Sequence, residues 1–90
     1  MSVATRFGAN LARCRKAAGL SQEELSFRAS LHRTQVGMLE RGSRIPRIDT
    51  LVKLAGSLGV APGELLEGLE WEPGETVAGT FEFSERDATL

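Results

Sequence analysis

The 90-residue sequence is poor in the residues that build metal sites and disulfide frameworks. It contains one cysteine, one histidine, one tryptophan and no tyrosine. A single cysteine excludes an internal disulfide, and one cysteine with one histidine leaves no ligand set for a zinc-type site. No apolar run approaches the roughly 18–20 residues that cross a bilayer, and the opening MSVATRFGANL lacks a signal-peptide core. We therefore expect a cytoplasmic protein with no metal, no cofactor and no membrane partner.

Charge is unevenly distributed, although the whole chain sums to only −1. Residues 1–59 carry ten Lys or Arg side chains and four acidic ones, whereas residues 60–90 carry eight acidic side chains and one arginine. The net charges of the two parts are therefore +6 and −7. A basic body of this kind indicates an anionic partner, and the alternative is a patchwork of solvated charges without function.

Apolar residues at helical spacing predict five short helices in a compact all-α domain. Ser21 and Glu24 form a capping box at the start of the second helix, and Gly19, Gly42 and Gly59 are left-handed stops. The expected helices are Ala4–Ala18, Gln22–Ala29, Arg33–Arg41, Ile48–Leu58 and a fifth from Pro62 through Leu66. The inward stripe of the fourth helix is Ile48, Leu51, Leu54, Ala55 and Leu58.

The character of the sequence changes after Gly68. Turn signals at Pro73-Gly74 and at Gly79, with alternation over residues 80–83, predict one or two strands or a hairpin. We expect a domain at residues 1–68 and an acidic tail at residues 69–90. Because an isolated hairpin is marginally stable, we favour its pairing with a second protomer, and the alternative is a hairpin folded back on the last two helices. The expected dimer contacts are Trp71, Val77, Phe81 and Phe83.

The second and third expected helices, joined by a tight turn, form a helix-turn-helix. A version that binds DNA needs an inward stripe, an outward stripe of small or polar side chains, and basic residues around them. Val36, Leu39 and Glu40 supply the inward side. The opposite face consists of Arg33, Thr34, Gly37, Met38 and Arg41, and Arg44 and Arg47 follow in the next loop.

Several short motifs, in order along the chain, resemble the Xre-type (Cro/cI repressor-like) helix-turn-helix family of bacterial and phage transcriptional regulators. They are GLSQEEL at residues 19–25, ERG at residues 40–42, Pro46, and LGV at residues 58–60 before Pro62. The resemblance covers residues 4–67. It implies a DNA-binding regulator, acting as a repressor, that binds a palindromic operator in double-stranded DNA as a homodimer. The third helix would then lie in the major groove.

The resemblance also implies roles for individual residues. The residues expected to contact base edges are Arg33, Thr34, Gly37 and Met38. Those expected to contact phosphates are Gln22, His32, Gln35, Arg41, Arg44 and Arg47. Arg15 and Glu40 match a pair that the family holds as a partly buried ion pair.

Three positions depart from the family pattern. Ser30 stands where the turn usually has glycine, His32 stands where a small hydroxyl cap is usual, and Gly37 leaves a gap in the base-contacting face. The competing hypothesis is an antitoxin-like or adaptor protein whose acidic tail binds a protein partner. No arrangement of nucleophile, acid and base predicts an enzyme, and Cys14 is expected to pack in the core.

Overall fold

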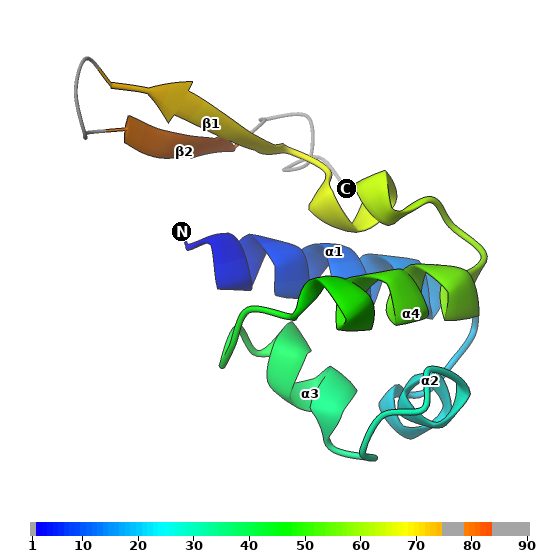
Figure 1. Cartoon of the computed structure of the whole chain (residues 1–90). Coiled ribbons are helices and arrows are strands. Elements are labelled where there is room, and N and C mark those ends of the chain that lie inside the picture. The colour runs from blue at the N-terminus through cyan, green and yellow to red at the C-terminus, as the bar shows by residue number, and fades with distance from the viewer. Residues whose placement is uncertain (1, 75–78, 84–90) are drawn as a thin grey trace.

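The chain folds into a helical body followed by a β-hairpin (Figure 1). The structure is a computed structural model that describes residues 2–74 and 79–83. Its elements are α1 (Val3–Ala17), α2 (Gln22–Arg28), α3 (Gln35–Glu40), α4 (Ile48–Leu58), the 3₁₀-helix η1 (Pro62–Leu66), β1 (Leu69–Pro73) and β2 (Gly79–Phe83). The body places α1 between η1 on one side and α3 on the other, and α4 contacts both η1 and α2.

One hydrophobic core joins all five helical elements. Its largest fully buried apolar side chains are Phe7, Leu11, Leu25, Val36, Leu39, Leu54 and Leu65. The amphipathic stripes expected from the sequence therefore point inward in α1, α2, α3 and α4. Ile48, at the first position of α4, is an exception because it is 76% exposed, and Ala18, expected on the inward stripe of the first helix, is also exposed.

The expectation of five α-helices is wrong, because η1 is a 3₁₀-helix rather than a fifth α-helix. The amide of Glu64 donates to the carbonyl of Ala61 (2.9 Å) and that of Glu67 to Glu64 (3.4 Å), so both bonds span three residues. The segment is also held from outside. The side-chain amide of Asn10 on α1 donates to the carbonyls of Leu65 (3.0 Å) and Glu67 (2.9 Å), at the C-terminal end of the segment, where a helix leaves its carbonyls without partners of its own.

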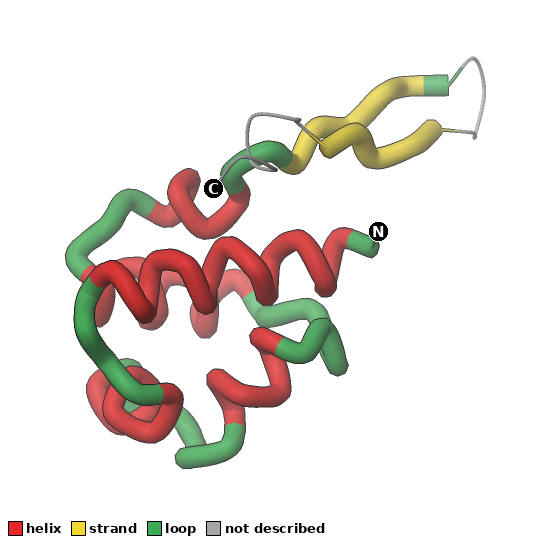
Figure 2. Tube along the Cα trace, turned by 180° about the vertical axis from the view of Figure 1, so that it is seen from behind, coloured by secondary structure: helices red, strands yellow, loops and turns green. Residues whose placement is uncertain are grey.

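The hairpin expected in the tail is present and projects from the body on the side away from α3, as Figures 1 and 2 both show. Its register pairs Leu69 with Phe83 and Trp71 with Phe81 on one face, and Glu70 with Glu82 on the other. One face is therefore apolar and the other acidic, with two like charges directly opposite each other.

The hairpin touches the body at its base. The Phe83 ring lies under the guanidinium of Arg6 on α1, with 5.6 Å from the guanidinium carbon to the ring centroid. Farther out, Trp71 and Phe81 meet edge to face with centroids 5.2 Å apart and are 54% and 49% exposed. Of the four residues expected at a dimer contact, Val77 lies outside the described residues.

Candidate nucleic-acid interface

The first helix of the helix-turn-helix begins with the predicted capping box. The Ser21 hydroxyl accepts from the Glu24 amide (3.0 Å), and the Glu24 carboxylate accepts from the Ser21 amide (2.9 Å). The hydrogen bond from the Ser21 backbone lowers the pKa of Glu24 below its ordinary value. These bonds fix the start of α2 and thereby the position of Gln22, the next residue.

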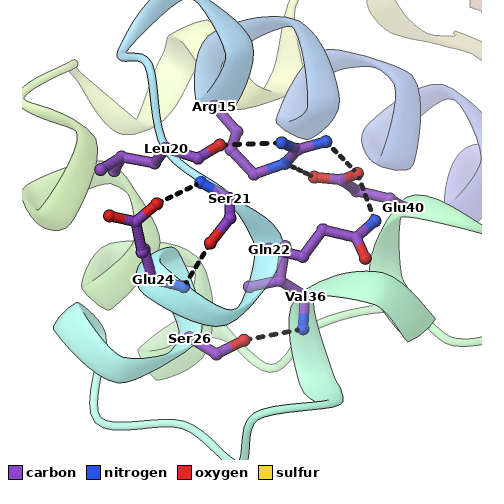
Figure 3. Close-up of polar contacts among 8 residues, drawn as sticks. All are labelled: Arg15, Leu20, Ser21, Gln22, Glu24, Ser26, Val36 and Glu40. Carbon is purple, nitrogen blue, oxygen red and sulfur yellow. Dashed lines mark hydrogen bonds and ion pairs between the residues drawn. The ribbon is translucent and has the colours of Figure 1, made fainter.

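A chain of polar contacts then connects α1, α3 and the start of α2 (Figure 3). Arg15 on α1 makes a bidentate contact with Glu40 on α3, through Nε to Oε2 (2.6 Å) and Nη2 to Oε1 (3.0 Å). The hydrogen bond to Glu40 raises the pKa of Arg15 above its ordinary value. Glu40 Oε1 also accepts from Nε2 of Gln22 (2.9 Å), so one carboxylate holds both side chains. This network sets the orientation of α3 against the rest of the body.

A second contact anchors the opposite end of α3. Val36 and Leu39 are fully buried, and the amide of Val36 donates to the hydroxyl of Ser26 on α2 (3.3 Å). Ser26 itself is fully buried. Ser26 was not among the predicted residues, because a serine one position after the inward Leu25 carries no pattern that marks it as a partner of α3.

The sequence predicted that the third helix begins at Arg33. In the structure α3 begins two residues later, at Gln35. Nδ1 of His32 lies 3.3 Å from the Thr34 amide, which donates to it, and 2.9 Å from the Thr34 hydroxyl. The Gln35 amide donates to the His32 carbonyl (2.9 Å). These bonds hold Arg33 and Thr34 in a turn, so the first α-helical bond is the one from Met38 to Thr34.

Gly37, which we placed on the outward face, is buried. The position of its missing Cβ is 3.1 Å from Oε1 of Gln22 and 3.3 Å from Nη1 of Arg41. Met38 and Gln35 beside it are half-buried. The space beside Gly37 is therefore not open, contrary to what the sequence suggested, because the side chains of Gln22 and Arg41 cover the middle of α3.

Exposed basic side chains surround this helix. Arg33 and Arg41 lie at its two ends, and Arg44 and Arg47 follow in the loop before α4. Nε of Arg47 is 3.4 Å from Oδ1 of Asp49, but both side chains are exposed and such a pair contributes little. The arrangement presents guanidinium groups to solvent on both sides of a short helix. A guanidinium matches the charge and geometry of phosphate oxygens.

Among the described residues, no cluster of three His, Cys, Asp or Glu side chains could hold a metal ion, and no helix is long and apolar enough to cross a membrane. Cys14 is partly exposed and packs against the core, and burial raises the pKa of its thiol. A thiol with a raised pKa is a poor nucleophile, so Cys14 acts as a packing residue.

Comparison with known proteins places this geometry in a family. A helix-turn-helix family model matches residues 11–65. The chain is 41% identical over 66 residues to y4dJ, an uncharacterized HTH-type transcriptional regulator of Sinorhizobium fredii. This alignment covers 73% of the chain and 86% of y4dJ. It is 44% identical over 48 residues to the control protein C.BamHI of Bacillus amyloliquefaciens, covering 53% and 59% of the two chains.

A solved structure agrees with these matches. The restriction-modification controller protein C.AhdI of Aeromonas hydrophila superposes with a TM-score of 0.67 at 44% identity, over 69% of this chain and 94% of that one. The family consists of transcriptional regulators and not of enzymes, in agreement with the sequence. From its motifs, its helix-turn-helix geometry and these relatives, the chain belongs to the Xre-type (Cro/cI repressor-like) helix-turn-helix family of DNA-binding transcriptional regulators.

Proposed function

We propose that the protein represses transcription by binding a palindromic operator as a homodimer, with α3 in the major groove. The observation that carries this proposal is the pairing of a rigidly anchored α3 with exposed arginines at both of its ends. A short helix with small and polar side chains, held by buried contacts behind it, can enter a groove about 12 Å wide. The likeness to the control proteins C.BamHI and C.AhdI supports a regulatory role.

The proposed contacts divide into two kinds. Arg33, Thr34 and Met38 face base edges, where a guanidinium can pair bidentately with guanine O6 and N7. The proposed phosphate contacts are Gln22, His32, Gln35, Arg41, Arg44 and Arg47. Phosphate contacts position the protein on the duplex, whereas the base contacts carry the sequence preference. Gly37, the fourth residue predicted at the base edges, has no side chain and is buried, so we leave it out of the first group.

Salt dependence tests the phosphate contacts. Binding to a duplex enriched from a random-sequence library by the protein itself should weaken steeply with salt. Arg44→Ala should lower the slope of log K against log salt by about one unit, because one fewer counterion is released. The matched control is Lys53→Ala on α4, an exposed cation outside the proposed contacts. Equal slopes for Arg44→Ala and the wild type would remove Arg44 from the interface.

The enriched sequences test the palindromic operator. We expect two inverted half-sites about one helical turn apart, because a two-fold dimer presents two copies of α3. A single asymmetric site would contradict the homodimer. If the protein represses its own promoter, a reporter gene placed behind the DNA upstream of the protein's own gene should be expressed at a higher level when Arg33 is replaced by alanine.

We propose that the exposed aromatic face of the hairpin forms the dimer contact. In this proposal residues 1–68 are the DNA-binding domain, and residues 69–90 are a separate unit. Trp71 and Phe81 are about half exposed on a two-stranded sheet that is marginally stable without further cover. Phe83 instead packs on Arg6 of its own chain, so its part in the dimer contact is the smaller one.

Two double variants separate the possible dimer surfaces. Trp71→Ser with Phe81→Ser should convert the dimer to a monomer in sedimentation velocity at micromolar concentration. The control is Ile48→Ser with Val52→Ser, which removes the exposed apolar residues of α4 (76% and 53% exposed). If the α4 variant dissociates and the hairpin variant remains dimeric, the hairpin contact is wrong and the outer face of α4 holds the two protomers.

A second function, binding of a basic protein partner, is favoured by the acidic face of the hairpin. Glu70, Glu72 and Glu82 are exposed there, and Glu70 lies directly opposite Glu82 in the ladder. Like charges in such a pair are unfavourable unless a cation covers them. Replacing Glu70, Glu72 and Glu82 together by glutamine should leave operator affinity unchanged and abolish binding of the basic protein partner. If operator affinity changes instead, the acidic face belongs to DNA binding and not to a protein contact.

A further inference from the structure

The middle of α3 contains a glycine that the helix itself does not favour. Glycine is the weakest helix former apart from proline, and Gly37 stands inside a helix of only six residues. The backbone of Gly37 is an ordinary right-handed one, since the positive-φ residues among those described do not include it. The reason for a glycine here must therefore lie in the space that a side chain would occupy.

That space is already occupied by two polar side chains. A Cβ at Gly37 would lie 3.1 Å from Oε1 and 3.6 Å from Cδ of Gln22, and 3.3 Å from Nη1 of Arg41. We call this arrangement the Gly37 notch: the bare Cα of Gly37, the amide of Gln22 and the guanidinium of Arg41. By contrast, a Cβ at Gly56, inside α4, would meet nothing within 4 Å.

The two walls of the notch differ in how easily they can move. Arg41 is exposed and ends in a flexible guanidinium, so it can move away from a methyl group at little cost. Gln22 cannot do so freely, because its Nε2 donates to Glu40 (2.9 Å) and Glu40 is itself held by Arg15 (2.6 Å). A methyl group at Gly37 would therefore push the Gln22 amide away from Glu40.

We infer that Gly37 is a positioning residue for DNA binding, whose missing side chain lets the Gln22 amide lie against α3 with its remaining N–H free to donate to a phosphate. An amide carries two N–H donors, and Glu40 takes one of them. The inference rests on the proposed phosphate contact of Gln22. It replaces the sequence-based interpretation of Gly37 as a gap in the base-contacting face.

The experiment compares the wild type with Gly37→Ala, Gln22→Ala, the double variant and the control Gly56→Ala. The probe is the duplex enriched from a random-sequence library, and binding is followed by fluorescence anisotropy over a range of salt. Gln22→Ala should weaken binding by about 2- to 10-fold, as expected for one hydrogen bond. Gly37→Ala should weaken it by a similar factor with an unchanged salt slope, because glutamine is neutral, and the double variant should be no weaker than Gln22→Ala.

Thermal unfolding supplies the readout that separates positioning from general damage. Gly56→Ala should raise the Tm and leave affinity unchanged. Gly37→Ala should raise the Tm by about 4–8 °C in the Gln22→Ala background, where only the flexible Arg41 side chain borders the notch, and by less in the wild type. Affinity would thus fall without a fall in stability, which a merely structural role of Gly37 does not produce.

Two results would overturn the inference, and they are distinguishable from failure of the proposed function. If Gln22→Ala weakens binding but Gly37→Ala does not, or if the two effects multiply, the notch does not position Gln22. If Gln22→Ala itself binds as tightly as the wild type, the proposed phosphate contact is wrong. The inference then falls with it, whatever the Tm values show.

Discussion

Replacing Ser30 by glycine should stabilise the protein, although it adds no contact. Ser30 follows the end of α2 with φ of 57°, and it is the one non-glycine residue with positive φ in the described parts of the chain. The amides of Ser30 and Leu31 donate back to α2, to Phe27 (3.1 Å) and Ser26 (2.8 Å), in the hydrogen-bond pattern of a Schellman motif. Both bonds come from the backbone and survive the substitution.

The magnitude follows from the backbone conformation. A residue with a Cβ in the left-handed region costs about 1–2 kcal/mol, whereas glycine loses about 0.5–1 kcal/mol more conformational entropy on folding. The difference predicts a gain of about 0.5–1 kcal/mol, or roughly 2–8 °C in Tm for a domain of this size. Glycines with φ of 72°, 74° and 70° already follow α1, α3 and α4, so α2 is the exception.

Urea denaturation and thermal unfolding of Ser30→Gly measure the gain, with two controls. Ser30→Ala removes the exposed hydroxyl but keeps the Cβ, and should give no increase. Ser43→Gly makes the same change one residue after a left-handed position, where φ is not positive, and should be neutral or destabilising. If Ser30→Gly is no more stable than the wild type, or if Ser30→Ala gains as much stability, the left-handed backbone of Ser30 does not destabilise the protein.

Three further substitutions test packing and electrostatics, each by urea denaturation. Gly8→Ala should cost about 1–3 kcal/mol, because its Cβ would lie 2.5 Å from the Leu39 carbonyl oxygen on α3; wild-type stability would mean that α1 and α3 can separate freely. Glu40→Gln should cost about 1–3 kcal/mol and lower the Tm, since it leaves the half-buried Arg15 without its charged partner; an unchanged Tm would mean that the pair is not structural. The pKa of Glu24 is lowered in the folded protein. Its contribution to the free energy of unfolding is therefore complete above about pH 5 and is lost as the pH falls through the pKa of the folded state. Glu24→Gln should therefore destabilise at neutral pH and lose that effect in acid, and a pH-independent difference would rule out the capping carboxylate as its source.

Much of the fold could be predicted from the sequence because it depends on neighbours along the chain. The capping box at Ser21, the glycine stops and the apolar spacing of four helices are all interactions over three to five residues, and the structure shows each of them. The hairpin was predicted for the same reason, from turn residues and alternation. The start of α3 was not, because it depends on the His32 ring accepting from Thr34, which a pattern of residue types does not reveal.

The residues and motifs were enough to predict the helix-turn-helix, its family, the arginines around its third helix and, through the family resemblance, the Arg15–Glu40 pair. Other contacts between residues far apart in the chain followed only from the packing of the helices. Gln22 and Glu40 are 18 residues apart and Asn10 and Leu65 are 55 apart, yet each pair is joined by a hydrogen bond of 2.9 or 3.0 Å. Such contacts depend on how the helices pack, which no local period encodes. For that reason Gly37, a gap in the sequence pattern, is in the folded protein a place where two other side chains meet.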